Sequence, residues 1–163
     1  MPPLPPLSQP PPPKRDGKEY RIRPLKRGDR DNVFKLLAAS GWPVEAGEQE
    51  LAISWVVQHP EMESFVAHNV ASYSRLFGLI TMSHRPQLRF GGRVACIDLF
   101  VVSDEHRDKG VGSDLLAQAL RRTEALACKR IELYLPGTRD PRHDFFETHG
   151  FARIGEELYV RQK

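Results

Sequence analysis

The sequence has few cysteines and no long apolar run, and each shortage excludes a class of protein. Cys96 and Cys128 are the only cysteines, and each lies in an apolar stretch. We therefore expect two buried thiols, no disulfide framework and a reducing, cytoplasmic setting. No apolar run approaches the roughly 20 residues that a membrane span needs. The proline-rich N-terminus also lacks the pattern of a signal peptide.

Concentrated charge and metal-binding patterns are missing as well. The formal net charge is +3, and the six histidines show no spacing that is typical of a metal site. Because nucleic-acid binders usually present a concentrated basic face, this charge favours a small anionic ligand over nucleic acid. We expect no metal, no nucleic acid and no membrane partner. The 163 residues, 40% hydrophobic and 28% charged, suffice for one soluble globular domain.

Proline is concentrated at the N-terminus. Residues 1–17 (MPPLPPLSQPPPPKRDG) form a low-complexity segment, and proline has a fixed φ and no N–H. The pattern predicts an extended or disordered tail before a domain over residues 18–163. Its Pro10–Arg15 stretch fits a proline-rich ligand that docks on a partner, and the alternative is a dispensable tail.

The remaining sequence predicts four helices and about seven strands in the order β-α-α-β-β-β-α-β-α-β-β. The expected strands cover 20–25, 64–68, 76–82, 94–102, 130–135 and a closing hairpin over 151–161. The expected helices cover 30–39, 45–58, 110–127 and 140–149. Meandering strands followed by a strand–helix–strand unit predict a mixed α/β (α+β) fold, with a sheet that is antiparallel first and parallel at its centre.

One loop has the features of an anion site. The strand Val94–Val102 is apolar on both faces, as a central strand should be, and it leads to Gly110-Val-Gly112 at the start of a helix. Glycines let an anion approach the backbone, and a helix start offers unpaired N–H groups and a positive dipole end. The alternative is an ordinary turn whose glycines serve packing. The dinucleotide-binding pattern G-x-G-x-x-G is excluded, because Leu115 stands where its third glycine would be. The nucleotide-binding motif G-x-x-x-x-G-K-[ST] does not occur in the sequence either.

The segment Arg107-Asp-Lys-Gly110-Val-Gly112 resembles the R/Q-x-x-G-x-G/A loop of the GCN5-related N-acetyltransferase (GNAT) superfamily. The strand Ile97–Val102 precedes the loop as in that family, and His143–Phe151 is similar to the family's A-x-x-F-Y-E-x-x-G-F segment. The resemblance covers about residues 20 to 161. It implies the GNAT fold, acetyl-CoA as cosubstrate and an acetyl transfer that needs no metal.

In this family the loop amides hold the pyrophosphate, and the pantetheine arm lies where strand 99–102 splays from strand 130–135. Backbone N–H groups near Phe100 and Val101 would stabilise an oxyanion. The acceptor amine attacks directly, so neither cysteine need be a nucleophile. The residues that the resemblance assigns to acetyl-CoA are Phe100, Val101, Val102, Arg107, Asp108, Lys109, Gly110, Val111, Gly112, Ser113 and Phe146.

Proton transfer is less clearly indicated. Asp98 is the only charged residue within 94–102, so burial should raise its pKa and suit it to act as a general base. The alternative is a buried structural aspartate. Phe146 stands where the family commonly has the tyrosine that protonates the leaving thiolate, so that role cannot be carried over. Tyr134 is the first candidate to replace it, with His143 or a water as alternatives.

The acceptor side of the family is built largely by the first two helices and their connection. Trp42, Glu45 and Glu48 lie there and would suit a cationic amine, although the glutamates equally suit a helix start. Three functions remain open: acetylation of a small-molecule amine, acetylation of a protein or peptide, and non-catalytic acyl-CoA binding or scaffolding. A homodimer is a further expectation.

Overall fold

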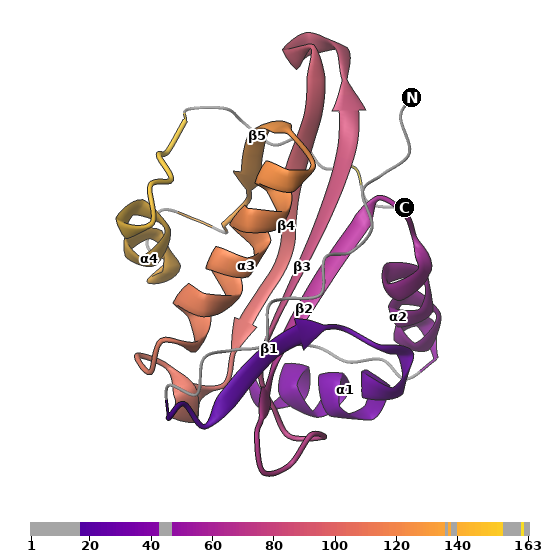
Figure 1. The fold of residues 1–163 in the computed structure, drawn as a ribbon, viewed down its shortest axis with the longest axis vertical. Helices are drawn as coiled ribbons and strands as arrows, with labels where there is room; N and C mark the ends of the chain where they lie inside the picture. The colour runs from indigo at the N-terminus through magenta and orange to yellow at the C-terminus, as the bar shows by residue number, and fades with distance from the viewer. Residues whose placement is uncertain (1–16, 43–46, 136, 138–139, 155–160, 162–163) are drawn as a thin grey trace. The chain divides into compact units, whose positions relative to one another are not determined.

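The computed structural model describes residues 17–42, 47–135, 137, 140–154 and 161. These residues divide after Leu133 into two compact units, each described here by itself. The tail, Glu45 and most of the expected closing hairpin lie outside the described residues. Figure 1 shows the helices and strands of both units.

The first unit contains a five-stranded sheet in the order β1-β2-β3-β4-β5. Its strands are β1 (Tyr20–Pro24), β2 (Met62–Asn69), β3 (Leu76–Gln87), β4 (Gly92–Val102) and β5 (Cys128–Leu133). The first four pair antiparallel with their neighbours, whereas β5 runs parallel to β4. The mixed sheet and the five strands expected before the closing hairpin are confirmed.

The predicted count of seven strands is not met, because the described residues form five. The two missing strands are those of the hairpin expected over 151–161. Phe151–Ile154 form no strand, and most of the rest lies outside the described residues. The parallel pair therefore lies at one edge of the described sheet, not at its centre as predicted.

The four expected helices are present among the described residues. They are α1 (Arg30–Ala39), α2 (Glu48–Gln58), α3 (Val111–Ala125) and, in the second unit, α4 (Arg142–Thr148). Short 3-10 turns lie before α1 and on either side of β4: η1 (Arg27–Asp29), η2 (Leu88–Phe90) and η3 (Asp104–His106). No helix in the described part of the chain is both long enough and apolar enough to cross a membrane.

Helices cover both faces of the sheet, and β3 shows how. A Cβ added to Gly78 would meet Leu115 of α3, whereas Leu79 belongs to a core cluster with Leu36 of α1 and Ile53 of α2. Successive strand residues point to opposite faces. Therefore α3 packs on one face of the sheet and α1 and α2 pack on the other.

A buried ion pair fixes the end of β1 to the start of α1. The Arg23 guanidinium donates to both carboxylate oxygens of Asp29 at 2.7 Å each, and the Lys26 N–H donates to Asp29 at 2.9 Å. The Arg23 guanidinium also lies 4.0 Å from the ring centroid of Tyr73. Burial acts to raise the pKa of Asp29, but the bonds from Arg23 and Lys26 outweigh it, so the pKa is lowered overall.

We predict that Asp29→Ala lowers the free energy of unfolding by about 3–5 kcal/mol at pH 7, because it leaves Arg23 buried without its partner. A lowered folded-state pKa means that the carboxylate's contribution is complete above the unfolded-state pKa and disappears as the pH falls through the folded value. The difference between the variant and the parent should therefore shrink below about pH 4.

Urea unfolding at several pH values measures this difference. Asp31→Ala is the matched control, because Asp31 forms an exposed ion pair with Arg30. This variant should lower the free energy of unfolding by less than about 1 kcal/mol. Equal losses for the two variants would contradict the structural importance of the buried pair.

Candidate functional site

β4 is irregular at Asp98. Leu99 lies opposite Thr81 of β3, and Ile97 lies opposite Met82, the next residue of β3. Asp98 is therefore the extra residue of a β-bulge. Bulges redirect a side chain out of the regular alternation and are frequent beside active sites. Asp98, the one carboxylate of this strand, thus lies at its one irregularity on the β3 side.

The Asp98 carboxylate accepts a hydrogen bond from the Ser83 hydroxyl at 3.1 Å. Asp98 is exposed, not buried as the sequence suggested. The surrounding groups nevertheless displace water from the carboxylate, and this loss of hydration raises the pKa of Asp98. The hydrogen bonds from Ser83 and Cys96 and the charge of Arg85 act to lower the pKa, but they do not outweigh it. The expected direction of the pKa shift is thus confirmed.

Cys96 lies two residues before Asp98, beside Ser83 on β3 and Glu132 on β5. Burial, followed by the charge of Asp98, raises the pKa of the Cys96 thiol to about 12. Burial also raises the pKa of Cys128. Because the thiolate is the nucleophilic form, neither cysteine is activated for attack. Glu132 accepts from the Arg130 guanidinium at 2.8 Å.

The ladder between β4 and β5 ends immediately before Asp98. Its last pair is Ile97 with Leu133, whereas β4 continues to Val102 and stays paired with β3 throughout. The backbone of Leu99–Val102 therefore has a side that β5 does not occupy. A gap at this place was expected for strands that hold a pantetheine arm.

The loop after β4 has two left-handed residues. Asp108 has φ 59° and Gly110 has φ 84°, and Gly110 is the N-cap residue of α3, where no described side chain caps the helix. A helix start of this kind presents backbone N–H groups and the positive end of the helix dipole to a ligand or to solvent. Arg107 pairs with Asp104 at 2.8 Å, and both are well exposed. These features fit a diphosphate.

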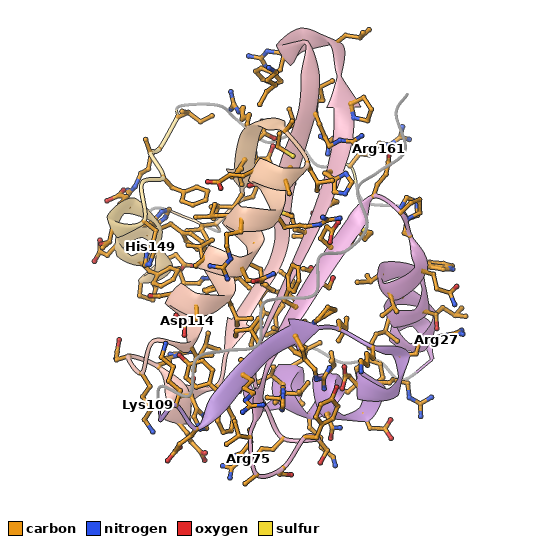
Figure 2. All side chains as sticks on the ribbon, in the orientation of Figure 1. Arg27, Arg75, Lys109, Asp114, His149 and Arg161 are labelled. Atoms are coloured by element: carbon orange, nitrogen blue, oxygen red, sulfur yellow. The ribbon has the colours of Figure 1, made fainter. Side chains whose placement is uncertain are left out.

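Three further residues at this loop escaped the sequence analysis. The Tyr20 hydroxyl donates to Asp114 at 2.7 Å, and the Lys18 ammonium donates to the same oxygen at 2.6 Å. Asp114 lies on the first turn of α3, and Figure 2 shows it with Lys109 at that end of the molecule. No sequence signal could reveal the pairs, because about 95 positions separate their members.

The remaining predicted residues lie on other elements, in the second unit or outside the described residues. Trp42 follows α1 and is 41% exposed, and Glu45 and the side chain of Glu48 lie outside the described parts. Tyr134 and Phe146 belong to the second unit. There Tyr134 is exposed, and Phe146 packs edge to face on two phenylalanine rings.

A cavity of about 580 Å³ lies between the end of α1 and η3, with Lys35, Ser40 and His106 among its lining residues. Neither Asp98 nor the loop from Arg107 onward lines it. The described residues contain no group of three or more histidine, cysteine, aspartate or glutamate side chains that could hold a metal ion.

The family model described as the acetyltransferase (GNAT) family matches residues 30–151. The match includes the bulge, the loop and most of both units. No curated protein sequence matches the chain.

Solved structures show the same fold. Aminoglycoside 6'-N-acetyltransferase from Acinetobacter baumannii is 16% identical, with a TM-score of 0.75 over 88% of this chain and 98% of that chain. Ribosomal-protein-alanine N-acetyltransferase from Brucella melitensis is 20% identical, with a TM-score of 0.67 over 88% and 99%. AAC(6')-Iy in complex with the bisubstrate analogue CoA-S-monomethyl-acetylneamine is 18% identical, with a TM-score of 0.74 over 90% and 99%.

The position of the loop depends on a close approach at Gly78. A Cβ there would lie 2.8 Å from Leu115, 3.0 Å from the Val101 carbonyl and 3.2 Å from Val111. We predict that Gly78→Ala lowers the free energy of unfolding by about 1–3 kcal/mol, because the first turn of α3 must move away from the sheet.

Denaturant midpoints measure this loss. Gly28→Ala is the control, since no described atom lies within 4 Å of the Cβ it would add, and it should change stability by less than about 0.5 kcal/mol. A neutral Gly78→Ala variant would show that the loop does not depend on this contact.

Proposed function

The chain belongs to the acetyltransferase (GNAT) family and is an acetyl-CoA-dependent N-acetyltransferase, and we propose that it acetylates a primary amine of a small molecule by direct attack in a ternary complex. The observation that carries the proposal is the position of Asp98. This carboxylate lies at a bulge of β4, immediately after the last backbone pair between β4 and β5. A carboxylate thus stands where the two strands part.

The cosubstrate fits the loop and the parted strands. Amides of the first turn of α3, together with Arg107 and Lys109, would hold the pyrophosphate. The residues proposed to hold acetyl-CoA remain Phe100, Val101, Val102, Arg107, Asp108, Lys109, Gly110, Val111, Gly112, Ser113 and Phe146. Of these, Phe146 lies in the second unit.

Asp98 would take the proton that the acceptor must lose. An alkylamine has a pKa of about 10 and arrives protonated at neutral pH. The raised pKa of Asp98 makes its carboxylate a better proton acceptor than an ordinary aspartate. The Ser83 hydroxyl orients the carboxylate through their hydrogen bond. Backbone N–H groups near Phe100 and Val101 would then stabilise the negative charge on the former carbonyl oxygen.

The departing group is the thiolate of coenzyme A, and its proton needs a donor other than Phe146. A thiol has a pKa of about 8.5, so its anion leaves without a strong acid. We assign the protonation to Tyr134, with His143 or a water as alternatives. Nitrogen attacks the carbonyl carbon to form a tetrahedral intermediate, and the bond from sulfur to that carbon breaks when the intermediate collapses. Asp98 takes the proton that the ammonium loses before attack, and the second proton lost by nitrogen replaces, through solvent, the one given to the thiolate.

The acceptor proposed is cationic, with Trp42, Glu45 and Glu48 on its side of the site. A protein or peptide acceptor is the second candidate. The similar structures include one named for an aminoglycoside and one for a ribosomal-protein alanine. Both candidates are tested by release of free coenzyme A thiol from acetyl-CoA with a panel of small amines and of peptides with free N-termini. Turnover of peptides only would overturn the small-molecule proposal.

Asp98→Asn should reduce kcat/KM by about 10²-fold or more. A carboxylate acts as a base only above its pKa, and that pKa is raised. The parent should therefore lose activity on the acid side at a higher pH than an ordinary aspartate would allow. The deficit of the variant should shrink at high pH, where the amine loses its proton unaided.

The pH profile of kcat/KM measures both effects. Asp31→Asn, which changes an exposed carboxylate of α1, should leave the profile unaltered. An Asp98→Asn variant with the parent's rate and acid limb would exclude Asp98 as the base.

The double variant Arg107→Ala, Lys109→Ala should raise KM for acetyl-CoA about tenfold and change kcat less than about twofold, because it removes charge from the pyrophosphate and not from the reacting atoms. Initial rates at saturating amine give the two constants. Arg27→Ala serves as the control, since Arg27 lies in η1, away from the loop. A loss confined to kcat would contradict the assigned role.

A further inference from the structure

The outer side of α2 is apolar and uncovered. Leu51 is 58% exposed and Trp55 is 66% exposed; four residues apart, they share one side of the helix. The inner side carries Ile53, which is 7% exposed, with Val56 and Val57 in the core cluster. A helix that is apolar on both sides normally has both sides covered. Within the described part of the chain, only the inner side of α2 is covered by other residues.

This exposure contrasts with the burial of the phenylalanines in the sheet. Phe65 and Phe77 in the sheet are 2% and 1% exposed, whereas both tryptophans of the chain are exposed. A tryptophan one turn from an exposed leucine is typical of a binding surface. Leu51 and Trp55 together are called the outer face of α2 below.

We propose that the outer face of α2 binds the proline-rich segment of the same chain, residues 1–16. Eight of its first 13 residues are proline, which favours polyproline II, a helix with 3 residues per turn. Leu4 and Leu7 are three residues apart and so share one edge of such a helix with Pro10. Aromatic surfaces bind this conformation with little loss of conformational entropy.

The segment is long enough to reach the helix. Leu25, which directly follows β1, belongs to the same core cluster as Ile53 of α2, so that end of β1 lies beside α2. Tyr20, at the other end of β1, is four residues before Pro24 and about 13 Å from it. Sixteen residues of polyproline II span about 50 Å. The segment can therefore turn back and lie along α2.

Attachment to the same chain also favours this occupant over a second copy. A covalently linked ligand experiences an effective concentration on the order of millimolar, so a small surface such as Leu51 and Trp55 suffices for binding. A second copy at micromolar concentration would need a larger interface.

Fluorescence of the full chain tests the proposal without reference to acetyl transfer. In a Trp42→Phe background, Trp55 is the only tryptophan, and acrylamide quenching measures its exposure. Adding Leu4→Asp and Leu7→Asp should raise the quenching constant about 1.5-fold or more, because charge on the leucine edge releases the segment. Ser8→Asp with Gln9→Asp adds the same charge off that edge and should leave the constant unchanged.

A second pair of variants tests the helix side. Leu51→Asp should raise the quenching of Trp55, whereas Ala52→Asp, at an exposed neighbouring position off the outer face, should not. Equal quenching in all these variants would overturn the proposal. So would quenching that falls as the protein concentration rises, because that result assigns the face to a second copy.

Discussion

The backbone of β4 forms a ladder with β3 along nearly its whole length but with β5 only as far as Ile97. Buried backbone groups must find hydrogen-bond partners, so a strand that loses one neighbour must turn its groups to a ligand, to solvent or to another part of the chain. The site follows from this constraint. Asp98 lies where the second ladder ends, and the loop that starts α3 follows the portion of β4 beyond its ladder with β5.

The first turn of α3 takes its place from the other strands. Gly78 of β3 leaves room for Leu115 and Val111, and Tyr20 of β1 holds Asp114 by a hydrogen bond. Gly78 and Tyr20, which lie more than 30 positions before Gly110, thus fix the orientation of the loop amides. An anion-binding helix start needs this support, because its N–H groups bind well only when they converge on one point.

Two aspartates of the chain show how surroundings set the charge of a carboxylate. Asp29 is buried, yet the bonds from Arg23 lower its pKa. Asp98 is exposed, no cation among the described residues bonds it bidentately, and lost hydration raises its pKa. The first is suited to holding β1 and α1 together. The second is suited to exchanging a proton.

Local patterns in the sequence were sufficient to predict the helices α1 to α4, the strands β1 to β5 and the loop from Arg107 to Gly112, because side-chain periodicity and glycine spacing are local properties. The sequence also singled out Asp98 as a lone charge in an apolar strand. It could not show the bulge at Asp98, the bond from Ser83 or the contacts at Gly78 and Asp114. These depend on which distant strand lies alongside and in which register, and only the packing of the tertiary structure decides that.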